Sequence, residues 1–254
     1  MTSNIFISIV LLVFCVKTSV FAQKKVETNY FKADGNAAKS KAEASYYLVV
    51  QTSGKHRNVV KYDSVDVKLE EISYRKAKPP SGIGDSVWWR YGSFKEWFPS
   101  GQLKAEGSCV FDLLHDNLKT YYPNGVLRRN DTYYIDTLRT GHCYAQDSSE
   151  ITHFPYFQKP EFEGGERTLF QYLANNVTYP AEARESNVQG IVYVSFVIGK
   201  TGAVENVKIK SGVSKLLDDE SMRVVKRMPK WKAGKQDGEL VRVNYTLPIS
   251  FKME

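Results

Sequence analysis

The chain has 254 residues, of which 42% are hydrophobic and 25% charged, a composition typical of a folded protein of one or two domains. Its formal net charge is +7, but the basic residues are spread along the chain without an Arg-rich helix or a dense Lys run. Nucleic acid is therefore not an expected partner. The 16 Tyr and 13 Phe residues favour β structure.

Residues 1–22 have the pattern of a cleavable secretory signal peptide. Residues 5–16 are apolar with one exception, and this run is shorter than the roughly 20 residues that span a bilayer. Residues 20–22 then offer small side chains at both positions that determine cleavage, before Gln23. We therefore expect a periplasmic protein that is exported by a signal peptide.

Two other interpretations of this segment stay open. If it is not cleaved, it would anchor the protein in the inner membrane, facing the periplasm and within reach of inner-membrane motor proteins. A lipid attached at Cys15 fits less well, because bulky Phe14 stands where lipoprotein signals have small residues. No later stretch of the sequence is apolar enough to span a membrane.

Two cysteines remain after removal of such a signal, Cys109 and Cys143. An oxidising compartment allows them to form a disulfide, and two buried free thiols are the alternative. Neither belongs to a Cys-x-x-Cys pair, and the four histidines are scattered, so we expect no zinc site. The sequence predicts no metal and no cofactor.

The chain between residues 23 and 155 divides into two parts. Residues 23–45 are polar and rich in Lys and Ala, and we expect a flexible lead-in or at most a short helix. Residues 46–155 are predicted to be an all-β region of antiparallel hairpins. A loop rich in Pro and Gly interrupts this region at residues 78–84.

An internal repeat occurs in the β region, with an offset of 24 residues between 97–104 and 121–128. Each copy has an aromatic pair, a Pro-Ser-Gly or Pro-Asn-Gly turn, and an apolar residue followed by a cation. Pro presets one turn dihedral and Gly supplies the positive one, so each copy predicts a β-hairpin. Residues 141–151 are a candidate degenerate copy, and residues 46–74 a candidate earlier one.

The repeat resembles the MORN-like hairpin repeats of exported bacterial proteins, over residues 90–151. The resemblance implies an elongated β-sheet that acts as a scaffold and has no activity of its own. An unrelated antiparallel sheet with two similar turns is the alternative.

Residues 156–254 predict a separate α+β domain. Its expected elements are helices at 166–177, 180–185 and 217–228 and strands at 190–198, 204–210 and 241–251. In the first helix, Phe170, Leu173 and Val177 share one face, with Leu169 beside them. We expect this face to be buried against the sheet.

The expected fold class of this domain is a two-layer α+β arrangement, a three-stranded antiparallel sheet with two main helices. The strand at 190–198 is apolar on both faces and is expected in the centre. The strand at 241–251 contains Pro248, which has no N–H to give a neighbour, so we expect it at an edge. Such an edge can accept an extended peptide or pair with a second copy of the chain. The alternative is that Pro248 and a covering loop only protect it.

Motifs with fixed spacing run through residues 160–252. They are Pro160-x-Phe162-x-Gly164-Gly165, Tyr179-Pro180-x-x-Ala183, Gln189-Gly190-x-Val192-x-Val194-x-Phe196-x-Ile198, Gly202-x-Val204, Asp219-Glu220-x-x-Arg223-Val224-Val225, Met228-Pro229-Lys230-Trp231-Lys232-x-Gly234 and Pro248-Ile249-x-Phe251. This set resembles the C-terminal domain of TonB, in the form found in Bacteroidota. The resemblance implies a protein that bridges the periplasm and grips TonB-dependent outer-membrane transporters.

The resemblance also implies where the partner binds. In the family, a short periplasmic peptide of the transporter, the TonB box, adds as a strand beside the last strand of the domain. The corresponding residues here are Val241, Arg242, Val243, Asn244, Tyr245, Thr246 and Leu247. A second contact segment maps to Asn175, Asn176, Val177 and Thr178. Asn176 stands where a contacting Gln is familiar in the family, so it could still hydrogen-bond, with a shorter reach.

The chain departs from a full-length TonB in two ways, because its apolar segment is short and hairpin repeats replace a Pro-rich spacer. Both put force transmission from the inner membrane in doubt. Our leading hypothesis is a TonB-like periplasmic protein that assists energy-dependent transport, and the alternative is a soluble exported adaptor without energy coupling. We expect no enzyme, because the usual hydrolase and phosphate-loop motifs are missing from the sequence. Carboxylates that only the fold brings together would escape this test.

Overall fold

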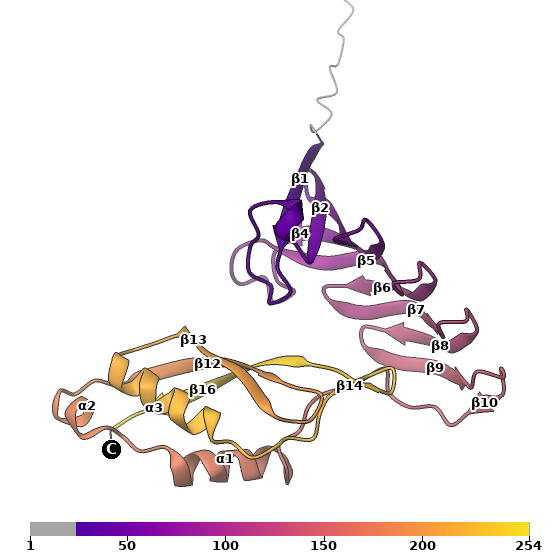
Figure 1. Ribbon diagram of the computed structural model, residues 1–254. Helices are drawn as coiled ribbons and strands as arrows, with labels where there is room; N and C mark the ends of the chain where they lie inside the picture. The colour runs from indigo at the N-terminus through magenta and orange to yellow at the C-terminus, as the bar shows by residue number, and fades with distance from the viewer. Residues whose placement is uncertain (1–23, 254) are drawn as a thin grey trace, which may run out of the picture. The chain divides into compact units, whose positions relative to one another are not determined.

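The computed structural model describes residues 24–253 of the chain (Figure 1). The expected signal peptide, residues 1–22, lies outside the described residues. The chain divides into two compact units, with the boundary between Thr152 and His153. Unit 1 contains the described residues up to Thr152, and unit 2 contains those from His153 onward.

Unit 1 is built on one ten-stranded antiparallel sheet in which the strands follow one another in chain order (Figure 1). Its strands are β1 (Lys25–Phe31), β2 (Tyr46–Ser53), β3 (His56–Asp63), β4 (Lys68–Ala77), β5 (Val87–Trp97), β6 (Leu103–Val110), β7 (Leu113–Tyr121), β8 (Leu127–Tyr134), β9 (Thr137–Tyr144) and β10 (Glu150–Ile151). A short 3-10 helix, η1 (Lys41–Glu43), lies between β1 and β2.

The described part of residues 23–45 contains a strand where we expected a flexible lead-in. Strand β1 pairs with β2 along its whole length. The ring of Phe31 stacks on Tyr46, with centroids 5.3 Å apart. Tyr30 contacts Tyr47 at 5.8 Å. Cross-strand aromatic pairs stabilise a sheet. Residues 23–45 are polar on average, so their composition did not show that Tyr30 and Phe31 pair with the next strand.

The internal repeat forms two hairpin turns of the same geometry. Gly101 and Gly125 both have a φ of 83°. The N–H of Gly101 donates to the carbonyl of Phe98 at 2.8 Å, and the N–H of Gly125 donates to the carbonyl of Tyr122 at the same distance. The glycines thus take the left-handed conformation that the repeat predicts. The likeness to MORN-like repeats stays a prediction.

The degenerate copy at residues 141–151 contains a third turn of this kind. The N–H of Ser148 donates to the carbonyl of Ala145 at 3.0 Å, and Ser148 has a φ of 67°. This conformation is strained for a residue that carries a Cβ. The third copy therefore keeps the turn although it lacks the glycine.

Replacing Ser148 by Gly should stabilise the protein by about 0.5–1 kcal/mol, because glycine adopts this φ without strain. The converse variant, Gly101→Ser, adds a Cβ that meets no described atom within 4 Å. Its expected loss of about 1 kcal/mol would therefore come from the backbone alone. Urea unfolding followed by circular dichroism measures both variants. Equal stability of all three proteins would contradict strain at these turns.

One face of the unit 1 sheet carries a row of alternating charges. The row is Glu71, Lys95, Glu106 and Lys119, each the cross-strand partner of the next. Lys95 Nζ lies 3.5 Å from Glu106 Oε2. Opposite charges at facing positions stabilise neighbouring strands, and a register slip of one residue would separate them. The row thus helps to fix the register of β4 to β7.

Cys109 and Cys143 lie on β6 and β9, with β7 and β8 between them. Because neighbouring strands are spaced by about 4.8 Å, the two positions are about 14 Å apart across the sheet, and a disulfide needs Cα atoms within about 7 Å. Both thiols are buried and free. The predicted disulfide is therefore wrong, and the alternative of two buried thiols is correct. Burial raises the pKa of the Cys109 thiol, which keeps it protonated.

Unit 2 contains the expected three-stranded antiparallel sheet, in the order β13-β12-β16, with its helices on one face (Figure 1). Strands β11, β14 and β15 form a second small sheet that the sequence did not predict. The elements of unit 2 are β11 (Phe157–Gln158), α1 (Gly165–Asn176), α2 (Ala181–Glu185), β12 (Gly190–Ile198), β13 (Val204–Ser211), α3 (Lys215–Lys226), β14 (Lys235–Gln236), β15 (Glu239–Leu240) and β16 (Val243–Phe251).

The core of unit 2 lies between the sheet and the helices. The central strand β12 buries Val192 and Val194 completely on this side. On its other side, Ile191 is 43% and Tyr193 is 40% exposed. The central position of β12 is as expected, but only one face of the sheet is covered.

Most of the face expected for the first helix is turned to the core, because Leu173 and Val177 pack against it, and Phe170 is the exception. Leu169 is buried, whereas Phe170 is 58% exposed. The reason is Tyr172, whose hydroxyl donates to the carbonyl of Val224 on α3 at 3.2 Å. This contact rotates α1 so that Leu169 and Tyr172 face inward and Phe170 points outward.

Candidate functional site

Strand β16 forms an edge of the main sheet of unit 2. It pairs antiparallel with β12 along its whole length, from Val243 to Phe251. No strand among the described residues pairs with its other side. The odd-numbered side chains of β16 turn toward the core and the even-numbered ones are exposed. One long side of its backbone is thus open to an additional strand.

Pro248 indicates which amides of β16 face outward. Along an antiparallel strand, residues alternate in pointing their N–H and C=O groups toward one neighbour or the other. A proline inside a strand is found where its nitrogen faces away from the paired neighbour. Pro248 lies within the pairing, opposite Tyr193, so we infer that its backbone faces outward. Asn244 and Thr246 then point their N–H and C=O groups to the open side as well.

The chain itself covers the beginning of the last expected strand. Val241 and Arg242 precede β16 instead of belonging to it, and the N–H of Val241 donates to the carbonyl of Gly234 at 3.0 Å. Arg242 forms an ion pair with Glu205 at 2.7 Å. Gly234 packs against Val243, since a Cβ on it would lie 2.8 Å from Val243 Cγ2. The unpaired edge of β16 therefore begins at Val243, and the expected partner contacts of Val241 and Arg242 stay predictions.

The second expected contact segment, at the end of α1, is held by α3. Arg223 donates to the carbonyl of Asn176 at 2.8 Å, and Glu220 accepts from the N–H of Thr178 at 2.7 Å. The side-chain amide of Asn176 donates to the carbonyl of Tyr172 at 2.7 Å. The amide that was expected to reach a partner thus closes the last turn of its own helix.

The two sets of expected contacts lie at opposite ends of β16. Tyr179, which directly follows residues 175–178, contacts the ring of Phe251 at 5.6 Å. The other set, residues 243–247, lies at the beginning of the strand. The six residue intervals from Tyr245 to Phe251 span about 20 Å of extended strand. The structure therefore does not bring the two sets together.

Glu220 holds the segment after α1 in its ionised form. Burial opposes ionisation of this carboxyl, but hydrogen bonds from Arg223 and from the N–H of Thr178 outweigh it and lower its pKa. A charge-assisted hydrogen bond of this kind is stronger than one between neutral groups. The ion pair thus connects α3 to the segment that leads into α2.

Glu220→Gln should lower the free energy of unfolding by about 1–2 kcal/mol at neutral pH. Because its pKa is lowered by folding, the contribution of Glu220 is present above the unfolded-state pKa and is lost as the pH falls through the folded-state value. Denaturant unfolding at a series of pH values should show the stabilities of the two proteins converging as the pH falls below the lowered pKa of Glu220.

The control for this measurement is Asp219→Asn. Asp219 is the neighbouring residue on α3, is half-exposed, and pairs with Lys215. Exposed pairs of this kind contribute little, so we expect a change below about 0.5 kcal/mol. A stability difference between Glu220→Gln and the original protein that stays constant down to low pH would contradict the assignment of the charge.

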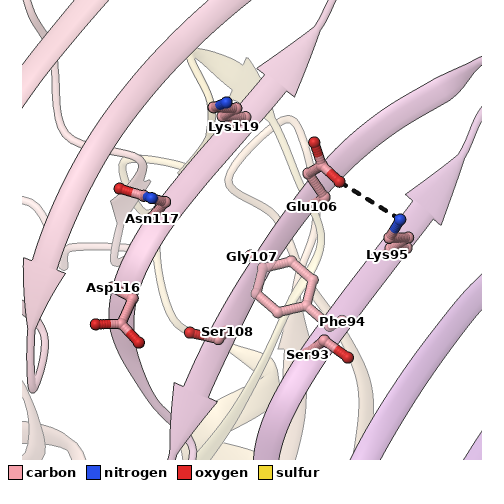
Figure 2. Close-up of a pocket in the computed structure, with 9 residues that line it drawn as sticks. All are labelled: Ser93, Phe94, Lys95, Glu106, Gly107, Ser108, Asp116, Asn117 and Lys119. Carbon is pink, nitrogen blue, oxygen red and sulfur yellow. Dashed lines mark ion pairs between the residues drawn. The ribbon is translucent and has the colours of Figure 1, made fainter.

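A shallow hollow of about 320 Å³ lies on the sheet of unit 1, over β5, β6 and β7 (Figure 2). It is lined by Ser93, Phe94, Lys95, Glu106, Gly107, Ser108, Asp116, Asn117 and Lys119. Figure 2 shows that Lys95 and Glu106 face each other across it, and their charges compensate one another. The ring of Phe94 lies against Gly107, where a Cβ would come within 2.8 Å of it. The hydroxyl of Ser108 donates to the carbonyl of His115, and Glu106 is paired with Lys95, so we do not place the functional site here.

The described residues offer no group of three or more His, Cys, Asp or Glu side chains that could hold a metal ion. Within residues 24–253, no helix is long and apolar enough to cross a membrane. We take the open side of β16, with the outward backbone of Asn244 and Thr246, as the candidate functional site.

Residues 175–253 match the family model described as Gram-negative bacterial TonB protein C-terminal. The match includes α2, β12, β13, α3 and β16, and it leaves out α1 apart from its last two residues, Asn175 and Asn176. No curated protein and no solved structure matched the chain. Unit 2 thus contains a region similar to the TonB C-terminal domain, which supports a TonB-like role in energy-coupled transport.

Proposed function

We propose that the protein binds TonB-dependent outer-membrane transporters in the periplasm, by adding a peptide strand of the transporter to the open side of β16. The observation that carries this proposal is the unpaired edge with the outward backbone of Asn244 and Thr246. Strand addition takes its affinity from main-chain hydrogen bonds. The family match to residues 175–253 supports the class of partner.

The proposed role is to assist energy-dependent transport without catalysing a reaction. Binding at a strand edge needs backbone donors and acceptors and no cofactor. The second expected contact segment, residues 175–178 at the end of α1, is held to α3 and lies near the C-terminal end of β16. We therefore assign the primary contact to residues 243–247 and give residues 175–178 no direct part in it.

Thr246→Pro should abolish most of the binding, because it removes an outward N–H and leaves the pairing with β12 intact. We expect a loss of at least about tenfold in affinity. Fluorescence anisotropy with synthetic peptides from the periplasmic N-terminal segments of the host's TonB-dependent transporters measures it. The matched control, Thr246→Ala, keeps the N–H and should bind as the original protein does. Equal affinities of the Thr246→Pro and Thr246→Ala variants would contradict binding of a peptide strand to the open side of β16.

An exported adaptor without energy coupling is the second candidate. The ten-stranded sheet of unit 1 favours it, because a scaffold of this kind stands where the resemblance implies a Pro-rich spacer. Such an adaptor would use the same strand edge.

N-terminal sequencing of the protein isolated from the cell envelope distinguishes the two candidates. The adaptor is expected to begin at Gln23 in the soluble periplasmic fraction, because residues 5–16 are too short to span a bilayer. A chain that retains residues 1–22 in the inner-membrane fraction would instead support a transducer that contacts motor proteins.

A further inference from the structure

The face of the unit 1 sheet that carries the alternating charges also carries a row of uncharged polar side chains. Each charged residue on β4 to β7 stands two positions along its strand from a short polar one, as Glu71 does from Ser73 and Lys119 from Asn117. Residues two apart on a strand share a face of the sheet. Figure 2 shows both sets of side chains next to each other over β5, β6 and β7.

This row extends across the sheet from β2 to β9, with one member on each strand. Its members, which we call the polar row, are Gln51, Asn58, Ser73, Ser93, Ser108, Asn117, Thr132 and Thr140. Neighbours in the row are direct cross-strand partners except at two irregularities in the pairing, between β4 and β5 and between β6 and β7. Neighbouring strands are about 4.8 Å apart, so the row is about 34 Å long.

Two hollows of the unit 1 surface lie along the polar row. The hollow of about 320 Å³ over β5 to β7 is lined by Ser93, Ser108 and Asn117, among others. A second hollow, of about 270 Å³, lies over β2 to β5 and is lined by Gln51, Asn58 and Ser73, among others. The row therefore forms the floor of a shallow trough over much of its length.

The composition of the row distinguishes it from an ordinary solvated strand face. Lys and Glu are usual at exposed positions, and they occupy the neighbouring row of Glu71, Lys95, Glu106 and Lys119. Every member of the polar row is instead Ser, Thr, Asn or Gln. The restriction to short uncharged side chains thus continues across the strands, although these positions are far apart along the chain.

Charges beside the polar row compensate one another. Lys95 lies 3.5 Å from Glu106, and Glu71 lies 2.5 Å from Lys68. Such a surface attracts neither a polyanion nor a polycation strongly. The row itself also lacks the large apolar or aromatic anchors on which protein interfaces depend. These properties favour a long ligand that is uncharged and polar.

Two tyrosines border the trough. Tyr91 lines the second hollow, and Arg75 lies over its ring at 5.2 Å. Tyr134 stands two positions after Thr132 on β8 and is 53% exposed. A sugar ring has hydroxyl groups around its edge and an apolar face of C–H groups. It can therefore hydrogen-bond to amides and hydroxyls and stack on a neighbouring aromatic ring.

We propose that the polar row binds an extended, β-linked glycan of uncharged sugars, which lies across the strands with about one ring over each. In such a glycan each ring advances the chain by a length close to the strand spacing, so a repeating ligand meets a repeating surface. An extended peptide matches less well, because its residues advance by about 3.3 Å. This binding does not involve β16, and it gives unit 1 a function of its own.

Chito-oligosaccharides, which are β-linked chains of N-acetylglucosamine, test the proposal on the full chain by isothermal titration calorimetry. We expect the hexasaccharide to bind at least about tenfold more tightly than the disaccharide, because more rings contact more members of the row. Maltohexaose has the same number of rings in a helical, α-linked chain, and it should bind more weakly than chitohexaose.

The double variant Ser93→Ala with Asn117→Ala removes two exposed polar groups from the middle of the row. It should weaken binding of chitohexaose by about tenfold, because two hydrogen bonds to the ligand are lost. The matched control is Ser64→Ala, which removes an exposed hydroxyl from the turn between β3 and β4, outside the row. This variant should bind as the original protein does. Circular dichroism melting checks that each variant is folded.

Three outcomes would overturn the proposal. They are no binding of chitohexaose at millimolar concentration, equal binding of chitohexaose and maltohexaose, and a folded double variant that binds chitohexaose as the original protein does. Binding at β16 is tested separately from this site. The double variant should bind transporter peptides normally, and Thr246→Pro should keep its affinity for chitohexaose. Loss of transporter binding alone would therefore refute the proposed function and leave the glycan site standing.

Discussion

Packing around Trp231 decides how the edge strand and the first helix of unit 2 lie relative to each other. Its ring contacts Phe162 before α1, Phe196 on β12 and Tyr245 on β16, at centroid distances of 5.3, 6.0 and 5.1 Å. The backbone N–H of Trp231 donates to the carbonyl of Gly202, and a Cβ at Gly202 would lie 1.9 Å from the Trp231 carbonyl oxygen. Only glycine allows this approach. One residue thus connects the helix, the central strand and the open edge.

The two units treat their strand edges differently. In unit 1, β10 has only two residues, and the loop after β1 folds back so that the N–H of Ala38 donates to the carbonyl of Tyr30 at 2.9 Å. Short edges and covering loops are ways to prevent unwanted pairing. In unit 2, β16 is nine residues long, and Pro248 removes a donor at one position. The other edge of this sheet is β13, which has eight residues and no second partner among the described strands, so the length of β16 alone does not mark it as a binding edge.

Much of unit 2 could be predicted from the sequence, because its three long strands alternate regularly and a Gly-containing turn joins two of them. The exceptions have local physical causes. The alternation of apolar and polar residues in the last strand extends back to Val241. The backbone N–H of Val241 donates to the carbonyl of Gly234, however, so the strand begins only at Val243. Phe170 continues the apolar stripe of the first helix but is exposed, and the contact of Tyr172 with Val224 explains why the buried face is shifted away from it. The separation of Cys109 from Cys143 depends on two intervening strands, which the spacing of cysteines does not reveal.

Selectivity and affinity at the candidate site come from different parts of the chain. Backbone hydrogen bonds along β16 give affinity, but every peptide offers the same backbone, so the edge alone discriminates weakly. The exposed side chains on β16, which are Asn244, Thr246, Pro248 and Ser250, are small and can accommodate many neighbours. The inward side chains of the same stretch, Tyr245 and Leu247, pack in or against the core. Discrimination between partner segments therefore depends on groups outside this strand.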